Sequence, residues 1–323
     1  MEKKRPLVID CDPGIDDAQC IMMLKGCGLF DIRGITPVHG NVPLAKTARN
    51  ALFLNDYYGI HTKVVPGAKE AILVRYPRAE YAHGLTGLGN MEFSTENLSF
   101  GEGHAWDLIW EQANLFPGEL ELIAVGPLTN IALTVLKYPE IVRLVKRLVI
   151  MGGAATAGNA TPYAEFNIWQ DPHAAKIVFH AGFDLTVVDL DCCYTGYLDL
   201  QDQAAALEIA RGTSLRELME GIVSFEEENL ENWAATEELK QQFRNQAVFC
   251  DAVAAAVLIR PEIAVCTDQY ATVDVDGAKT IGQTVVDWFG FLGQPNIHLA
   301  RSVDRDAYVK LYLDCLRSYG KEN

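Results

Sequence analysis

Positive charge is scarce in this sequence. Its 323 residues contain 27 Lys and Arg against 43 Asp and Glu, which gives a net charge of −16. No basic stripe is present, and aromatic residues are not interleaved with basic ones. Binding of DNA or RNA depends on Lys and Arg that neutralise phosphates, so we expect no nucleic-acid partner. A small neutral ligand is compatible with this composition.

Long apolar runs are also missing. No stretch approaches the roughly 18 apolar residues that a membrane-spanning helix needs, so we expect no membrane contact. The N-terminus begins with basic residues, but its apolar segment is too short for a signal peptide. The 8 cysteines form no C-x-x-C pair and no regular spacing. We therefore expect reduced thiols in a cytoplasmic protein.

Linkers, internal repeats and low-complexity segments are absent as well, which favours a single domain over residues 1–323. Segments with strand periodicity alternate with helical segments through most of the chain, and residues 198–260 are richer in helix. The fold class that this order predicts is α/β: an open, mostly parallel central sheet with helices on both faces, plus a helical C-terminal half. A glycine-rich stretch, residues 68–90, interrupts the pattern and is expected to be a loop beside a site.

The segment LVIDCDPGIDD, residues 7–17, concentrates negative charge at one turn. It opens as a strand, on which Asp10 and Asp12 lie two residues apart and therefore on the same face. Asp16 and Asp17 follow at the start of an apolar-periodic helix, where acidic residues are stabilised by the helix dipole. Carboxylates so close together repel one another unless a cation lies among them. Oxygen ligands without a nearby Cys/His cluster favour Ca²⁺ or Mg²⁺ over zinc, although helix capping is an alternative role.

Other polar clusters follow further predicted strands. They are HGN at residues 39–41, VGPLTN at 125–130, and MGG at 151–153, which leads into a long polar excursion. The carboxyl ends of parallel strands share one edge of a sheet, where ligands bind. We therefore predict that these clusters and the acidic turn form one composite site.

These motifs, taken together, resemble the nucleoside hydrolase family, the inosine-uridine preferring N-ribohydrolases. The resemblance rests on DCDPGIDDA (10–18), GN (40–41), VGPLTNIA (125–132), MGG (151–153), N-x-T-P-x-A-E-F-N (159–167), DP (171–172), Asp251 at the start of an apolar helix, TVVD (284–287) and PN-x-x-x-A-x-x-VD (295–304). It implies a Rossmann-like nucleoside hydrolase fold and Ca²⁺-dependent hydrolysis of the N-glycosidic bond of a ribonucleoside, giving ribose and a free base. It also implies a homo-oligomer, either a dimer or a tetramer.

The resemblance assigns roles to individual residues. The implied metal ligands are Asp12, Asp17, Thr129 through its carbonyl oxygen, and Asp251. Asp12 is also the implied general base, while Asp10 supports the other acids. The implied substrate-binding residues are Asp16, Asn41 and Asn167 at the 2′- and 3′-hydroxyls, Asn159 and Glu165 at the 5′-hydroxyl, and Asp251, which also touches the ribose, together with His83 and Met151.

Several of these residues have ordinary alternative roles. Asn159, Glu165 and Asn167 are also turn-forming residues that hydrogen-bond to the local backbone. His83, in the glycine-rich stretch, has plain solvent exposure as its alternative role, which is the more common one for a histidine in a loop. Cys250 stands where many family members carry His or Trp, so it is a candidate catalytic residue at the leaving base. A thiol is only a weak hydrogen-bond donor, and simple packing is its alternative role.

Two other functions compete with the hydrolase. A strand followed by D-x-D also describes phosphatases of the haloacid dehalogenase type. That type expects a Thr or Val after its second Asp, whereas Pro13 and Gly14 follow here. The second alternative is a ribose- or nucleoside-binding relative that lost its chemistry, for which only Cys250 argues. The sequence does not predict whether a purine or a pyrimidine is preferred.

Overall fold

The computed structural model describes residues 3–89, 91–233 and 236–320, without the side chains of 227 and 229–233. Its centre is an eight-stranded sheet with the order β2-β1-β3-β4-β5-β10-β8-β9. The strands are β1 (Arg5–Cys11), β2 (Phe30–Pro37), β3 (Leu120–Ala124), β4 (Val145–Met151), β5 (Leu185–Val188), β8 (Ala264–Val273), β9 (Thr284–Asp287) and β10 (Ile297–Val303). Pairs among β1–β5 and β10 are parallel, and β8 pairs antiparallel with β10 and β9. The predicted open, mostly parallel sheet is confirmed.

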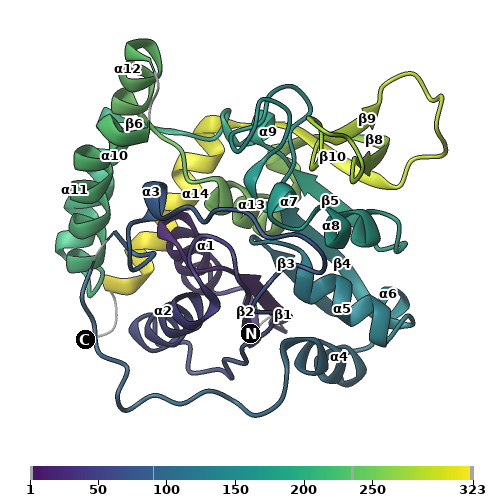
Figure 1. The fold of residues 1–323 in the computed structure, drawn as a ribbon. Helices are drawn as coiled ribbons and strands as arrows, with labels where there is room; N and C mark the ends of the chain where they lie inside the picture. The colour runs from purple at the N-terminus through teal and green to yellow at the C-terminus, as the bar shows by residue number, and fades with distance from the viewer. Residues whose placement is uncertain (1–2, 90, 234–235, 321–323) are drawn as a thin grey trace.

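Helices cover both faces of this sheet (Figure 1). The longer ones are α1 (Ile15–Gly26), α2 (Leu44–Tyr57), α4 (Ala105–Leu115), α5 (Thr129–Lys137), α8 (Pro172–Phe179), α10 (Leu200–Arg211), α11 (Arg216–Trp233), α12 (Glu237–Asn245), α13 (Cys250–Ile259) and α14 (Arg305–Arg317). Short turns of helix are α3 (Glu80–His83), α6 (Ile141–Leu144), α7 (Phe166–Gln170) and α9 (Leu190–Cys193), and β6 (Leu198–Asp199) pairs with β7 (Gln246–Ala247) apart from the main sheet. Helices α1, α13 and α14 pack together on one face, and α4, α5 and α8 on the other.

Strand β1 is buried on both sides, as a central strand of a parallel sheet should be. Its side chains alternate: Leu7, Ile9 and Cys11 pack into the core under α1 and α13, whereas Val8 packs into the core under α5 and α8. The chain leaves β1 for β2 on one side and later returns to β3 on the other. The strand order therefore reverses at the carboxyl end of β1, which is where open α/β sheets form a crevice for ligands.

The C-terminal half adds both helices and strands. Helices α10, α11 and α12 form an outer layer, seen at the left of Figure 1. Strands β8–β10 then complete one end of the sheet, and α14 packs against α1. This contact between the two ends of the chain is the observation behind our proposal of one domain over residues 1–323.

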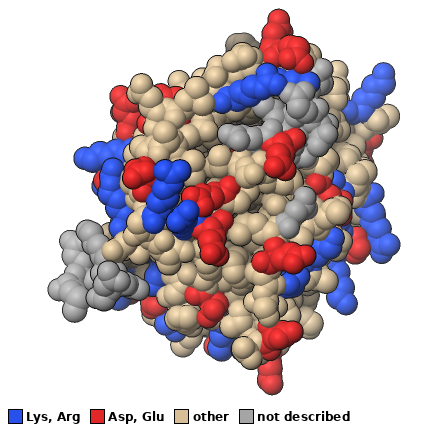
Figure 2. Space-filling view, turned by 90° about the vertical axis from the view of Figure 1, so that its left-hand side faces the viewer, with Lys and Arg blue, Asp and Glu red and all other residues tan. Residues whose placement is uncertain are grey.

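The surface on the side of α10–α12 carries charges of both signs. Figure 2 shows Asp and Glu side chains interspersed with Lys and Arg, and no basic stripe crosses the coloured part of this face. Within the described part of the chain, no helix is both long and apolar enough to cross a bilayer. All 8 cysteines are free thiols.

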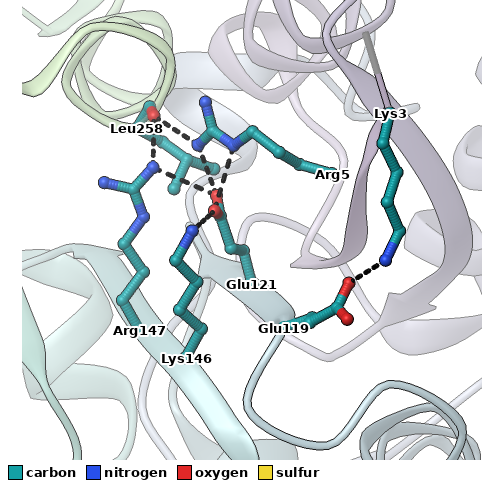
Figure 3. A network of polar contacts seen from close by, with 7 residues as sticks. All are labelled: Lys3, Arg5, Glu119, Glu121, Lys146, Arg147 and Leu258. Carbon is teal, nitrogen blue, oxygen red and sulfur yellow. Dashed lines mark hydrogen bonds and ion pairs between the residues drawn. The ribbon is translucent and has the colours of Figure 1, made fainter.

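A buried ion-pair network lies at the amino end of the sheet, opposite the crevice (Figure 3). The Glu121 side chain is fully buried and accepts hydrogen bonds from Arg5, Lys146 and Arg147. Arg5 and Arg147 also donate to the carbonyl oxygen of Leu258, which ties α13 to β1 and β4. Burial opposes ionisation of Glu121, but the hydrogen bond from Arg5 and the charges of Arg147 and Arg5 outweigh it and lower its pKa.

Removal of Glu121 should weaken the fold. We expect Glu121→Ala to lower the free energy of unfolding by about 3 kcal/mol, because three cations then lose their common partner. The exposed pair of Lys3 and Glu119 provides the control, since Glu119→Ala should cost less than about 1 kcal/mol. Urea unfolding followed by circular dichroism measures both. The contribution of Glu121 should be present above the ordinary Glu pKa and disappear as pH falls through its lowered pKa. Equal losses in the two variants would contradict the network's role.

Candidate active site

Asp10 ends β1 beneath the crevice and is held by two neighbours. One carboxylate oxygen accepts hydrogen bonds from the Thr36 hydroxyl at 2.6 Å and from the Asn130 amide at 2.8 Å. Its other oxygen is buried without a hydrogen-bond partner. Burial raises the pKa of Asp10 to about 7. Asp10 therefore joins β1, β2 and α5 beneath the crevice, and its support of the other acids stays a prediction.

Asp12 directly follows β1 and is enclosed by the backbone of the segments that follow β2 and β3. Its Oδ2 accepts a hydrogen bond from the Asn41 N–H at 2.7 Å, and its Oδ1 is buried without a hydrogen-bond partner. A Cβ atom on Gly40 would lie 1.9 Å from Oδ2, and one on Gly126 would lie 2.5 Å from Oδ1. Glycine is therefore required after β2 and after β3 so that the backbone can approach this carboxylate.

Asp17 closes the first turn of α1. Its side chain accepts hydrogen bonds from the Gly14 N–H at 2.8 Å and the Asp12 N–H at 3.1 Å. These bonds satisfy backbone donors at the start of the helix, so the capping role is present. Burial and the neighbouring charge of Asp16 nevertheless raise the pKa of Asp17 to about 8. Capping alone leaves this acidic turn electrostatically unfavourable.

Asp251 reaches the same point from the first turn of α13. One carboxylate oxygen each of Asp16, Asp17 and Asp251 lies within 4.8 Å of the others. Burial, followed by the charges of Asp16 and Asp17, raises the pKa of Asp251, and burial with the charge of Asp17 raises that of Asp12. Among the described ion pairs, only His83 approaches one of these acids. An oxygen-only donor set with unpartnered Oδ1 atoms on Asp12 and Asp16 fits a hard divalent cation.

Thr129 begins α5 and uses its hydroxyl in a relay of hydrogen bonds. Arg78 donates to Nδ1 of His39 at 2.8 Å, so the other ring nitrogen carries the proton and donates to the Thr129 hydroxyl at 3.1 Å. Thr129 in turn donates to Asp171 at 2.8 Å. Burial, followed by the charge of Arg78, lowers the pKa of His39 to about 3 and keeps it neutral. The hydroxyl of Thr129 is thus engaged with His39 and Asp171, and the ligand role expected for its carbonyl oxygen stays a prediction.

A small cavity of about 90 Å³ opens beside the acidic trio. Nine residues that the sequence suggested lie in its wall: Asp16, Asn41, His83, Met151, Asn159, Glu165, Asn167, Cys250 and Asp251. Asp16 comes from α1, Asn41 from the loop after β2 and His83 from α3. The others lie at the end of β4, in the segment that follows it as far as α7, and at the start of α13. Asp12, Asp17 and Thr129 are not part of this wall. The structure thus brings every candidate substrate contact to one cavity.

Two of the wall residues also accept hydrogen bonds from nearby backbone N–H groups. Glu165 caps α7, where its oxygens accept hydrogen bonds from Asn167, Ile168 and Gly153 at 2.8–3.1 Å. Oδ1 of Asn159 accepts from the Phe166 N–H at 2.9 Å. The turn-forming role considered for both residues is therefore present. Burial raises the pKa of Glu165 to about 7.

Asn167 is positioned differently. Its amide nitrogen donates to the carbonyl oxygens of Val125 at 2.9 Å and Met151 at 3.2 Å. These bonds fix the side chain between β3 and β4 and leave its oxygen free to accept a hydrogen bond from a ligand. The sulfur of Met151 lies 3.3 Å from the same nitrogen.

His83 is packed into the site rather than exposed to solvent. It ends the short helix α3, and its side chain is 16% exposed. Nδ1 accepts a hydrogen bond from the Ile15 N–H at 3.2 Å and lies 3.8 Å from Asp16. Burial lowers the pKa of His83, although Asp16 opposes this. The imidazole is therefore neutral, and His83 is one of the residues in the cavity wall.

Cys250 begins α13, directly before Asp251. The Cys193 thiol donates to its carbonyl oxygen at 3.8 Å. Cys250 is half-buried, packs against the core and is one of the residues in the wall of the small cavity, so the packing role is present, and its catalytic role at the leaving base stays a prediction.

A residue that the sequence did not single out, Glu226, lies in a second, larger cavity. That cavity has a volume of about 580 Å³ and shares Asp16, Ala82 and His83 with the small one. Glu226 lies in the middle of α11, within a run of acidic residues. Such a run is typical of a helix face exposed to solvent. Helix α11 packs against α3, the helix that carries His83 of the same cavity, and nothing local in the sequence announces this contact.

Known proteins resemble this chain over nearly its whole length. The profile of the family described as "Inosine-uridine preferring nucleoside hydrolase" matches residues 7–310. The chain is 35% identical over 324 residues to the pyrimidine-specific ribonucleoside hydrolase RihB of Escherichia coli, with 99% of both chains covered.

Solved structures agree with this match. The purine-preferring ribonucleoside hydrolase from Gardnerella vaginalis superposes with a TM-score of 0.89 at 26% identity, over 98% of this chain and 99% of that one. A plant nucleoside hydrolase gives 0.85 at 27% identity, over 98% and 99%. The phosphatase alternative is not favoured by any of these matches. The resemblance inferred from the motifs is confirmed: this chain belongs to the inosine-uridine preferring nucleoside hydrolase family.

Proposed function

We propose that this protein binds Ca²⁺ at the acidic turn and uses it to hydrolyse ribonucleosides to ribose and free base. Hydrolysis of N-glycosyl bonds is the activity of the family to which the chain belongs. The observation that supports the proposed site best is the small cavity, which is lined with hydrogen-bonding groups and adjoins the trio Asp16, Asp17 and Asp251. A pentose offers vicinal hydroxyls to such groups.

In this proposal the residues of the site have separate roles in binding the cation and the sugar. The cation would be held by Asp12, Asp17, Asp251 and the carbonyl oxygen of Thr129. Asp16 lies close to Asp17 and Asp251, so its carboxylate would also be near the cation. Asp16, Asn41 and Asn167 would bind the 2′- and 3′-hydroxyls, and Asn159 and Glu165 the 5′-hydroxyl. When bound, Ca²⁺ would lower the pKa of a water molecule and orient the sugar through its hydroxyls.

Asp12 is the proposed general base, because its Oδ1 is free of other hydrogen bonds. It would accept a proton from the attacking water, whose oxygen bonds to the anomeric carbon while the bond to the base breaks. A single attack of this kind inverts configuration at that carbon. The positive charge that develops on the sugar ring is stabilised by the surrounding carboxylates. Met151, His83 and Cys250 would shape the cavity on the side of the base.

The relatives differ in base preference, since RihB is named pyrimidine-specific and the Gardnerella enzyme purine-preferring. The expected dimer or tetramer stays a prediction. So does the cytoplasmic location, which the 8 free thiols support.

Removal of the cation should abolish activity. We expect reducing-sugar release from a panel of ribonucleosides to fall at least about 100-fold in chelator and to return on addition of Ca²⁺. Mg²⁺ and Mn²⁺ added in the same way identify the preferred ion. Full activity after exhaustive chelation would contradict the metal site. Calorimetric binding of nucleosides without release of base, at any metal content, would instead favour the non-catalytic binder.

A further inference from the structure

The large cavity adjoins the place where the base leaves. Because it shares Asp16, Ala82 and His83 with the small cavity, a base attached to a ribose in the small cavity extends into it. This step rests on the proposed function. Its remaining walls come from α10, α11, α12 and the segment that precedes α13. Their chemistry should therefore determine which base is accepted.

One wall of this cavity presents a carboxyl group without a partner. Glu226, on α11, is half-buried and forms no hydrogen bond or ion pair with another described residue. Burial and the charge of Asp16 raise its pKa to about 8. The other charged or titratable wall residues are Asp16, His83 and Arg244, of which Arg244 is exposed and therefore screened by solvent. A cation inside the cavity would stabilise both acids.

Two aromatic residues, Phe243 and Phe249, are among the residues that line the same cavity. Phe249 is buried, with its ring stacked on that of Tyr312, and Phe243 is half-buried on α12, with its ring edge-on to that of Tyr194. The face of an aromatic ring attracts a positive charge, most strongly where water is excluded. Carboxyl and aromatic groups around one space are thus suited to a flat cationic ring.

His83 and Cys250, the two wall residues proposed to lie on the side of the base together with Met151, are poor proton donors. His83 accepts a hydrogen bond at Nδ1 and is therefore neutral, and the Cys250 thiol is a weak donor. A neutral base such as uracil leaves its sugar readily only when it gains a proton or is otherwise stabilised. A base whose glycosidic nitrogen is already positively charged needs no proton.

We propose that the large cavity selects ribonucleosides with a cationic base, that is pyridinium ribosides, and that Glu226 is its specificity-determining residue. In this hydrolysis the water oxygen bonds to the anomeric carbon, and the carbon–nitrogen bond breaks. Its electron pair returns to the ring nitrogen, so the base leaves as a neutral pyridine. The water proton passes to Asp12 and then to solvent, and no oxidant or reductant takes part.

The test compares nicotinamide riboside with p-nitrophenyl riboside, whose leaving group needs no proton but carries no positive charge. We expect the ratio of their kcat/KM values to fall about tenfold in Glu226→Gln, because one partly buried charge pair is lost. Glu228→Gln is the matched control, since Glu228 is exposed on the same helix, and it should keep the ratio within about twofold. Thermal unfolding verifies that both variants are folded.

Uridine distinguishes the remaining outcomes. We expect the wild type to hydrolyse nicotinamide riboside at least about tenfold faster than uridine, since no proton donor is required. If Glu226→Gln reduces uridine hydrolysis more than hydrolysis of nicotinamide riboside, Glu226 is a proton donor and the proposal is overturned. It is also overturned, with the proposed function intact, if uridine is the better substrate. Release of ribose from none of the three compounds would overturn the proposed function itself.

Discussion

Asp12→Asn should lose at least about 10³-fold in kcat, because the variant lacks both the general base and a charged ligand of the cation. The amide keeps the shape of the side chain, and its oxygen can still accept the hydrogen bond from the Asn41 N–H. What disappears is the basic Oδ1, which is buried without another partner. Initial rates of ribose release at saturating nucleoside and Ca²⁺ measure the loss.

Stability measurements separate this loss from misfolding. Burial and the charge of Asp17 raise the pKa of Asp12, so removal of its charge relieves a repulsion. In chelator the variant should therefore unfold at a temperature no lower than that of the wild type. Added Ca²⁺ should raise the unfolding temperature of the wild type more than that of the variant, since a ligand stabilises the state that binds it. The control is Asp31→Asn, at the other end of the sheet, which should match the wild type in both assays. Retained activity in Asp12→Asn would show that Asp12 is not the general base.

Ribonucleosides should be hydrolysed faster than their 2′-deoxy counterparts by about 10³-fold or more, because loss of the 2′-hydroxyl leaves buried polar groups unpaired. The groups concerned are Asp16, Asn41 and Asn167, all in the wall of the small cavity. The free oxygen of Asn167 is fixed in place by two hydrogen bonds from its nitrogen, so it cannot turn to another donor. Values of kcat/KM for uridine and deoxyuridine give the ratio directly, and comparable values would refute the proposed sugar contacts.

Loss of the 5′-hydroxyl should matter much less. Glu165 and Asn159 already accept hydrogen bonds from backbone N–H groups, so neither is left wholly unpaired. We expect 5′-deoxyuridine to be slower than uridine by about tenfold, the value of one hydrogen bond. This compound is therefore the internal control for the 2′-deoxy comparison, since it also lacks one hydroxyl.

Much of the composite site could be predicted from local sequence because several of its parts follow recognisable strands. The run from Leu7 to Cys11 ends at a turn rich in acids, and Asn41 and Thr129 lie in polar clusters after later strands. The order of strands in the sheet could not be predicted, because it depends on contacts between segments far apart in sequence. That order places β1 between β2 and β3, so that Gly40 and Gly126 both meet Asp12.

The amino-acid sequence by itself determined the strand-helix alternation, the acidic turn and the family, because local periodicity and short motifs carry those signals. Only the tertiary structure decided which atoms each acidic side chain contacts. It turned both oxygens of Asp17 toward backbone N–H groups, left Oδ1 of Asp12 free, and brought Asp251 across more than two hundred residues to meet Asp16. It also made Glu226 a wall of the large cavity, although its sequence neighbours are equally acidic. Burial and proximity decide which carboxyl groups can act, and both arise from packing between distant segments.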